Sequence, residues 1–152
     1  MRRRHVLGGF LAWASLGSGC LSSSDEAQSE PATVENPPEW LRERGQCEDE
    51  WAWGSLELSR AEPGSGFGTA VVPYDRLGEE SKRLVRFAVH NDGAVACDQT
   101  GGTAFQTLLG DVDELAERDR EAHSENPWVY KIRTARATYR IERLEAFDAV
   151  LV

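Results

Sequence analysis

The chain has 152 residues, with 26 aspartates and glutamates against 17 lysines and arginines, and a formal net charge of −9 at pH 7. The roughly 110 residues from position 39 onward suffice for one hydrophobic core but not for two. An acidic surface repels phosphate backbones, so the composition disfavours general nucleic-acid binding.

Residues 1–20 have the three parts of a secretory signal: a charged start, a short apolar middle and a small-residue end. The apolar run is too short to cross a bilayer, which takes about 20 apolar residues. Arg3 and Arg4, followed by Val6 and Leu7, are similar to the twin-arginine export motif, which directs proteins that have already folded. The alternative is an ordinary signal for unfolded chains that carries extra arginines.

The small residues Gly17, Ser18 and Gly19 lead into Cys20 and resemble a lipobox. The resemblance implies that Cys20 is lipidated and becomes the new N-terminus. Gly17 stands where such boxes usually have an apolar residue, so the cleavage register stays open. A durable anchor needs two lipid chains, because each buried CH₂ contributes only about 0.8 kcal/mol. We therefore expect the protein on the extracellular face of the cell membrane, held to membrane lipid through Cys20.

Residues 21–38 are expected to form a disordered linker, since their serines, acidic residues and prolines offer too little apolar surface to offset the entropy of ordering. A single domain is expected over residues 39–152. Its first segment, Pro38–Arg44, has proline in the first turn and a glycine behind it, which predicts a short helix. Trp40 and Leu41 would pack that helix against the domain.

Two strands are predicted next, Glu50–Arg60 and Phe67–Val72, separated by a turn rich in proline and glycine. Because they are adjacent in sequence, they should pair as an antiparallel hairpin. Trp51 and Trp53 fall on the same face of the first strand. Large aromatic side chains in a small domain are expected in the core, and the alternative is that these two form a ligand-binding face.

Helical periodicity is clearest over Gly78–Val89, where apolar positions recur every three or four residues. Gly93 follows that helix and is free to adopt a left-handed conformation. A second helical region opens at Thr103–Leu109, and Gly110 should break or kink it, because glycine costs about 1 kcal/mol relative to alanine inside a helix. The charged segment Glu114–Asn126 is expected to be a frayed helix end followed by a loop.

Two further strands are predicted over Trp128–Ile132 and Ala137–Leu144, and the apolar end Ala146–Val152 would add a last strand or extend the one before it. The predicted order is therefore strand, strand, helix, helix, strand, strand. That order favours an α+β fold: a small antiparallel sheet of about four to five strands with two helices packed on one face.

A capped helix and a closing hairpin carry a family resemblance. The residues concerned are Val72–Glu80, Gly93, Trp128–Tyr130 and Tyr139–Ile141. This pattern, which covers about residues 67–145, is similar to a small uncharacterised domain of haloarchaeal lipoproteins. The abundance of acidic residues with only two lysines likewise resembles proteins of salt-loving archaea, whose acidic surface keeps them soluble in salt. The family implies no activity.

Cys47 and Cys97 are the two cysteines that remain after Cys20. Two cysteines in an exported domain usually form a disulfide. Closing a loop of this length would stabilise the fold by about 4 kcal/mol if the effect is purely chain entropy. The alternative is two buried free thiols.

Metal and catalytic chemistry find little support in the sequence. Only His90 and His123 lie beyond the signal, whereas a structural zinc site usually shows closely spaced pairs of ligands. The chain has no nucleophile elbow, no phosphate-binding loop and no His-Glu-x-x-His motif. No metal, cofactor or catalytic residue is therefore predicted. The alternative hypothesis is a small secreted hydrolase-like enzyme with a site near His90 or His123.

A basic cluster stands out near the C-terminus of this acidic chain. It comprises Lys131, Arg133, Arg136, Arg140 and Arg143. The cluster either forms a surface for an anion or an acidic partner, or pairs with acidic residues nearby, and pairing is the preferred interpretation. The expected function is a non-catalytic binding or interaction module for an unknown protein or small-molecule ligand. A structural envelope component is a third hypothesis, which an exposed Trp51 or Trp53 would indicate.

Overall fold

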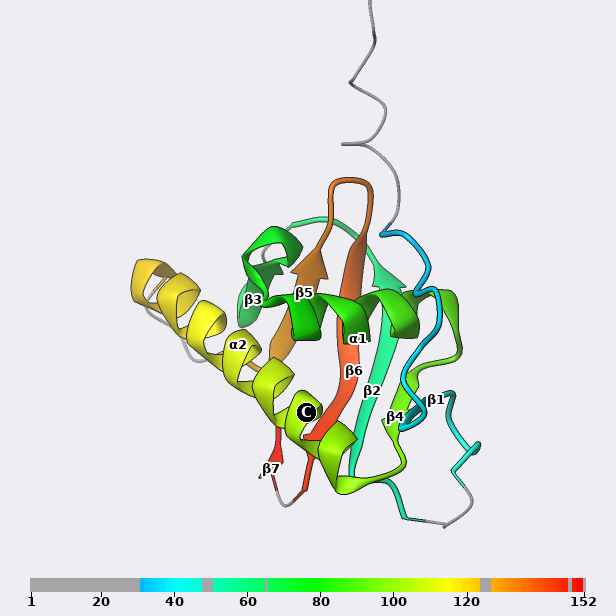
Figure 1. Ribbon diagram of the computed structural model, residues 1–152. Helices are drawn as coiled ribbons and strands as arrows, with labels where there is room; N and C mark the ends of the chain where they lie inside the picture. The colour runs from blue at the N-terminus through cyan, green and yellow to red at the C-terminus, as the bar shows by residue number, and fades with distance from the viewer. Residues whose placement is uncertain (1–30, 48–50, 65, 124–126, 148, 152) are drawn as a thin grey trace, which may run out of the picture.

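A computed structural model describes residues 31–47, 51–64, 66–123, 127–147 and 149–151. Within them the chain forms one mixed β-sheet and two α-helices, which is the α+β class expected from the sequence (Figure 1). No helix in this part of the chain is long and apolar enough to span a membrane. The predicted signal, with Arg3, Arg4 and Cys20, lies outside the described residues.

The sheet has the strand order β1–β4–β2–β6–β5–β3, and β7 also pairs with β6. Neighbouring strands are antiparallel except β3 and β5, which are parallel. The two longest strands, β2 and β6, pair at the centre of the sheet. The strand bounds are β1 Leu41–Arg42, β2 Gly54–Ala61, β3 Thr69–Pro73, β4 Ala94–Ala96, β5 Val129–Arg133, β6 Thr138–Ala146 and β7 Ala149–Val150.

Two helices, α1 (Glu79–His90) and α2 (Gln99–His123), pack on the same face of the sheet (Figure 1). A short 3₁₀ turn, η2 (Tyr74–Arg76), leads from β3 into α1. Helix α1 confirms the helix predicted from periodicity over Gly78–Val89. Gly93 has a φ of 83°, the left-handed conformation expected after that helix.

The hydrophobic core lies between the helices and the sheet. Its largest fully buried side chains include Phe105 and Leu108 of α2 and Leu56 of β2. Gly54 allows α2 to approach the sheet, because a Cβ at that position would lie 2.6 Å from the Phe105 side chain. The absence of a side chain at Gly54 therefore allows the N-terminal half of α2 to lie close to the start of β2.

A carboxylate ties the two helices together at the start of α1. Asp111 Oδ2, on α2, accepts hydrogen bonds from the Gly78 N–H at 2.9 Å and from the Ser81 hydroxyl at 2.6 Å. Ser81 is fully buried, so its hydroxyl requires such a partner. Asp111 also satisfies a backbone donor at the helix N-terminus, which Gly78 has no side chain to cap.

The predicted antiparallel hairpin of β2 with β3 is wrong, and the predicted antiparallel sheet of about four to five strands matches the mixed sheet only roughly. The described residues form a sheet of seven strands, in which β3 lies at one edge, parallel to β5, while β2 pairs with β4 and β6. The chain between β3 and β5 contains α1, β4 and α2, which is the long connection that parallel strands require. Turn composition marks where a strand ends, but it does not determine the strand's partner.

The predicted helix over Pro38–Arg44 is also wrong, since the segment forms the edge strand β1. Leu41 and Arg42 pair with β4, and the Cys97 N–H donates to the Trp40 carbonyl oxygen at 2.9 Å. Leu41 is fully buried and Trp40 packs against the core, so both residues hold the segment on the domain as expected. Pairing with the free edge of β4 outweighs the weak helix preference of so short a segment.

The break predicted at Gly110 does not occur, because α2 runs without interruption from Gln99 to His123. Phe105 and Leu108 before the glycine, and Val112 after it, are all fully buried. Burying side chains of this size contributes about 1.5–3 kcal/mol each, which exceeds the cost of about 1 kcal/mol for one glycine. Asp98 helps to start the helix by accepting a hydrogen bond from the Gly101 N–H at 3.0 Å.

Candidate functional site

Alternation along β2 and β6 turns one set of side chains toward the helices and the other set away from them. Leu56 and Leu144 face each other across the two strands and are fully buried on the helix side. The opposite side of the sheet, called the open face here, is polar. It carries Ser55 and Glu57 of β2, Arg143 and Glu145 of β6, and Val95 of β4.

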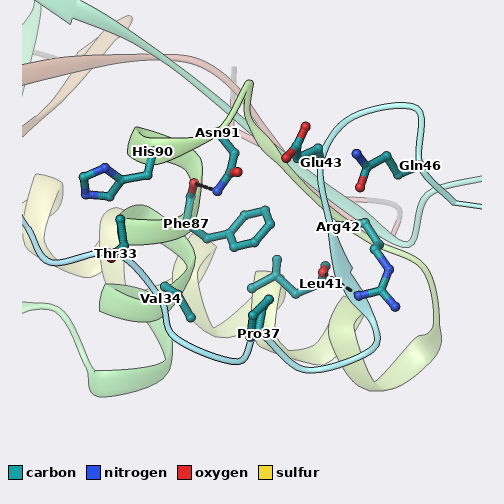
Figure 2. A pocket seen from close by; sticks show the side chains of 10 residues that line it. All are labelled: Thr33, Val34, Pro37, Leu41, Arg42, Glu43, Gln46, Phe87, His90 and Asn91. Atoms are coloured by element: carbon teal, nitrogen blue, oxygen red, sulfur yellow. Dashed lines mark hydrogen bonds between the residues drawn. The ribbon is translucent and has the colours of Figure 1, made fainter.

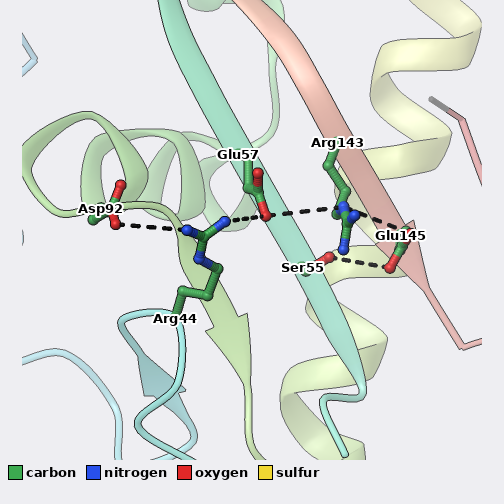
Figure 3. A network of polar contacts seen from close by, with 6 residues as sticks. All are labelled: Arg44, Ser55, Glu57, Asp92, Arg143 and Glu145. Carbon is green, nitrogen blue, oxygen red and sulfur yellow. Dashed lines mark hydrogen bonds and ion pairs between the residues drawn. The ribbon is translucent and has the colours of Figure 1, made fainter.

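Four side chains of alternating charge, called the charged row, cross the open face (Figure 3). Arg44 Nη1 lies 3.0 Å from Glu57 Oε1, and Arg143 Nε lies 3.9 Å from the same oxygen. Arg143 Nε is also 3.8 Å from Glu145 Oε1, and Ser55 Oγ donates to the other oxygen of Glu145 at 3.3 Å. The hydrogen bond to Glu57 raises the pKa of the Arg44 guanidinium above its ordinary value. Exposed ion pairs add little to stability, so the fold does not depend on the charged row.

A cavity of about 560 Å³, called the open-face cavity, lies beside the charged row. Trp51, Phe147 and Val95 supply its apolar lining, and Arg143 and Glu145 line its polar side. Trp51 is 68% exposed, which is unusual for an apolar side chain of that size. An apolar wall beside a few charged groups is the typical composition of a small-molecule site.

Phe147 is held in place from several directions at the edge of this cavity. Its backbone φ is 54°, a left-handed conformation that costs a non-glycine residue about 1–2 kcal/mol. Its N–H donates to the Trp53 carbonyl oxygen at 3.1 Å, and the two rings meet edge to face with centroids 5.0 Å apart. A Cβ at Gly102 would lie 2.9 Å from the Phe147 ring, so α2 packs closely against it. Phe147 is therefore held in a fixed position at the edge of the cavity that it lines.

The two tryptophans that the sequence placed on one face have different environments. Trp53 is half-buried and packs against the core and Phe147, as the core interpretation predicted. Trp51 is exposed and lines the open-face cavity, so the core interpretation is wrong for this residue. The strand starts only at Gly54, and the preceding residues do not follow its alternation.

A disulfide between Cys47 and Cys97 fixes the loop on one side of the open-face cavity. It joins the loop after β1 to the residue that follows β4, with the two Cα atoms 5.2 Å apart. Cys47 itself lines the cavity, and so does Arg44 from the same loop. The predicted pairing is confirmed, and the alternative of two free thiols is wrong.

Figure 2 shows a second cavity, of about 350 Å³, between the C-terminal end of α1 and the segment that leads into β1. His90 is exposed and lines this cavity, and its Nε2 hydrogen-bonds to the Pro31 carbonyl oxygen. The residues known to line the cavity include Glu43 but neither serine nor aspartate.

Of the two predicted histidines, the structure describes only the side chain of His90. Among the described residues, neither a serine nor an aspartate lines the cavity beside His90. His123 is the last residue of α2, and its side chain is not among those that the structure describes. Among the described residues, no group of three or more histidines, cysteines, aspartates or glutamates is placed to hold a metal ion. The hydrolase alternative stays a prediction.

The basic cluster separates into two groups in the structure. Lys131 Nζ donates to two backbone carbonyl oxygens of the β2–β3 loop, at 3.0 and 3.4 Å. Arg140 Nε lies 3.6 Å from a carboxylate of its own strand, and Arg143 belongs to the charged row. Arg133 and Arg136, at the β5–β6 turn, have no ion pair with any described residue.

Comparisons with protein-family models, with curated proteins and with solved structures found no match. Sequence reasoning missed Arg44, Glu57, Glu145 and Phe147, which the fold brings together from distant positions. For Glu57 and Glu145, the alternation of polar and apolar residues along β2 and β6 was the one available signal, because it predicts which side chains point away from the core.

Proposed function

We propose that this protein is an exported, lipid-anchored binding module that holds a small amphipathic ligand on the open face of its sheet. One observation carries the proposal: the open-face cavity, about 560 Å³ in volume, combines an aromatic wall with charged groups of both signs. Its volume falls within the range of about 300–1,000 Å³ typical of ligand pockets. The disulfide keeps the loop of Arg44 in position beside it.

The chemistry of the lining defines the ligand class. Trp51 and Phe147 offer apolar surface, which favours a ligand with an aliphatic or aromatic group. Arg143 donates to an anionic group, and Glu145 accepts from an ammonium group. A molecule with an apolar side chain, a carboxylate and an amine, such as a free apolar amino acid or the end of a short peptide, satisfies all three.

The proposed location rests on the predicted signal and on Cys20. A chain with Arg3-Arg4 export and a lipidated Cys20 would lie on the extracellular face of the membrane, in keeping with the resemblance to haloarchaeal lipoproteins. The disulfide suits that oxidising location. Cys20→Ser should release the protein into the medium, whereas Ser18→Ala should leave it in the membrane fraction. Equal membrane retention of both variants would contradict the anchor.

Ligand binding is tested on the Cys20→Ser protein with four probes that share one apolar group. Leucine carries a positive and a negative charge, and leucinamide carries only the positive one. The third probe, 4-methylpentanoate, carries only the negative charge, and 3-methylbutan-1-ol carries none. NMR chemical shifts should move for Trp51 and Arg143 with leucine, and less with the other three probes. Trp51→Ala and Arg143→Gln should each raise the leucine Kd at least tenfold.

Two control variants remove a similar side chain away from the cavity, one an exposed tryptophan and the other an ion-paired arginine. Trp128 is 59% exposed, like Trp51, but it lies at the start of β5 and not at the cavity. Arg118 is paired with Glu114 on α2, much as Arg143 is paired on β6. Trp128→Ala and Arg118→Gln should bind leucine as the parent does. If no probe shifts the cavity residues, or if the controls lose binding as the cavity variants do, the proposal is wrong.

A further inference from the structure

Arg143, which donates to the anionic group of the ligand in the proposed site, lies between two carboxylates of the charged row (Figure 3). Its Nε is 3.9 Å from Glu57 Oε1 and 3.8 Å from Glu145 Oε1. Both distances exceed the length of a hydrogen bond. Neither carboxylate therefore takes up the N–H donors of Arg143, although both stand close to its charge.

Each of these two carboxylates accepts a hydrogen bond from a different side chain. Arg44 Nη1 donates to Glu57 Oε1 at 3.0 Å, and Ser55 Oγ donates to Glu145 Oε2 at 3.3 Å. The bond from Arg44 joins two charged groups, and such bonds are roughly twice as strong as neutral ones. The nearest oxygen of Asp92 lies 4.0 Å from Arg44, which is too far for a hydrogen bond. Glu57 is therefore the carboxylate to which Arg44 donates.

The pairing of β2 with β6 places Glu57 directly opposite Arg143. Side chains in such positions on antiparallel strands have Cβ atoms about 4.5–5.5 Å apart, and opposite charges there attract each other. A Glu57 carboxylate with no other partner would therefore reach Arg143 and neutralise it. Arg44 comes from outside this pair of strands, in the loop after β1, three residues before the disulfide-bonded Cys47.

We infer that Arg44 is a positioning residue, which holds the Glu57 carboxylate away from Arg143 and so keeps Arg143 available for the anionic group of a ligand. This role rests on the proposed function, because it concerns the same cavity and the same anionic group. Glu57 has the opposite effect, since its carboxylate competes with the ligand anion for Arg143. The disulfide contributes to binding because it fixes the loop that carries Arg44.

The test measures Kd values by NMR titration of the Cys20→Ser protein at low ionic strength, where exposed charges are screened least. The first probe is 4-methylpentanoate, whose single charge is the anionic group that Arg143 should bind. Arg44→Gln should raise its Kd about threefold, because the released Glu57 neutralises Arg143 and exposed ion pairs have effects of this order. Glu57→Gln should lower the Kd by about the same factor, because the competing carboxylate is lost.

The double variant Arg44→Gln/Glu57→Gln separates an action through Glu57 from a direct attraction of the anion by Arg44. No carboxylate at position 57 is then left to neutralise Arg143, so the Kd should match that of Glu57→Gln to within about 1.5-fold. An equal rise in Kd on Arg44→Gln with and without Glu57 would show that Arg44 attracts the anion directly, and would overturn the positioning role. So would an Arg44→Gln variant that binds 4-methylpentanoate as the parent does.

A probe of opposite charge detects a merely structural effect of the substitution. Leucinamide carries only a positive charge, so Arg44→Gln should leave its Kd unchanged or lower it. A rise in Kd for both probes would mean that the loop has moved, and would contradict the positioning role. Arg42→Gln is the matched control, because it removes the same charge two residues earlier, from a side chain that lines the second cavity. It should change neither Kd by more than about 1.5-fold.

The parent protein and Arg143→Gln distinguish failure of this role from failure of the proposed function. If the parent binds 4-methylpentanoate through Arg143 and Arg44→Gln has no effect, only the role of Arg44 is wrong. If the parent binds neither probe, the proposed function is wrong and the role of Arg44 is wrong with it.

Discussion

The two faces of the sheet differ in what they contribute. On the helix side, Leu56, Leu144 and Ile132 are fully buried, and each side chain of this kind stabilises the fold by about 1.5–3 kcal/mol. On the open face, side chains such as Glu57 and Arg143 form exposed ion pairs that water screens. Since one face supplies the stability, the other is free to vary in charge and shape without unfolding the domain. Substitutions on the two faces should therefore affect different measurements.

The largest effect is expected from Phe105, at the centre of the helix side. Phe105→Ala should lower the free energy of unfolding by about 3–5 kcal/mol, because a fully buried aromatic ring leaves a cavity behind. Phe67→Ala is the matched control, since Phe67 is 75% exposed and makes an edge-to-face contact with Trp128. Its loss should cost at most about 1.5 kcal/mol in the same denaturant titration. Equal costs at the two positions would contradict the division between the faces.

The disulfide cross-links the chain beside the open-face cavity, so its removal should affect stability and binding together. The double variant Cys47→Ala/Cys97→Ala should lose about 2–4 kcal/mol of unfolding free energy, because the cross-link no longer restricts the unfolded chain. Leucine binding should weaken in the same variant, since the loop that carries Arg44 is released from β4. Calorimetry of unfolding and of leucine binding, each compared with the oxidised parent, measures both effects. Unchanged binding would show that this loop does not form the site.

Substitution of Asp111 tests the contact between the two helices on the helix side of the sheet. Asp111→Ala should cost about 1–3 kcal/mol, because it removes the acceptor for the buried Ser81 hydroxyl and for the Gly78 N–H. Asp113→Ala, two residues further along α2 at an exposed position, should cost less than about 0.5 kcal/mol. Thermal unfolding of the two variants side by side measures the difference. A cost at Asp113 as large as that at Asp111 would show that helix charge, and not this contact, is responsible.

The smallest effect on stability is expected on the open face. Arg143→Gln should change the free energy of unfolding by less than about 1 kcal/mol, because Arg143 is half exposed and its ion pairs are long. The same substitution should weaken leucine binding at least tenfold, as stated for the proposed site. Denaturation and binding measured on one preparation separate the two outcomes. A large loss of stability would mean that the open face contributes to the fold and is not free for function.

Prediction from sequence succeeded where the determining interactions are local. Helix α1 has its apolar positions at regular spacing within 12 residues, and Gly93 supplies the backbone freedom that the following turn requires. The pairing of Cys47 with Cys97 followed from the small number of cysteines and from the expectation that the chain is exported. The continuity of α2 through Gly110 was missed, because it depends on burial against strands that are distant in sequence.

The candidate site was harder to predict than the fold class. Period-two alternation indicates that Ser55 and Glu57 leave the core, but it does not say which strand lies beside them. Glu57 meets Arg143 only because β2 pairs with β6, and Arg44 joins them only because β1 pairs with β4. Long-range register of this kind has no local sequence signal, so the charged row could not be inferred before the sheet order was known.

The most direct test of the proposed binding module is leucine titration of the Cys20→Ser protein, followed residue by residue by NMR. Saturable shifts confined to the open-face cavity, centred on Trp51 and Arg143 and absent from exposed residues of the helix side such as Arg118, are the predicted result. Shifts that are absent, that do not saturate, or that are spread evenly over both faces would contradict it.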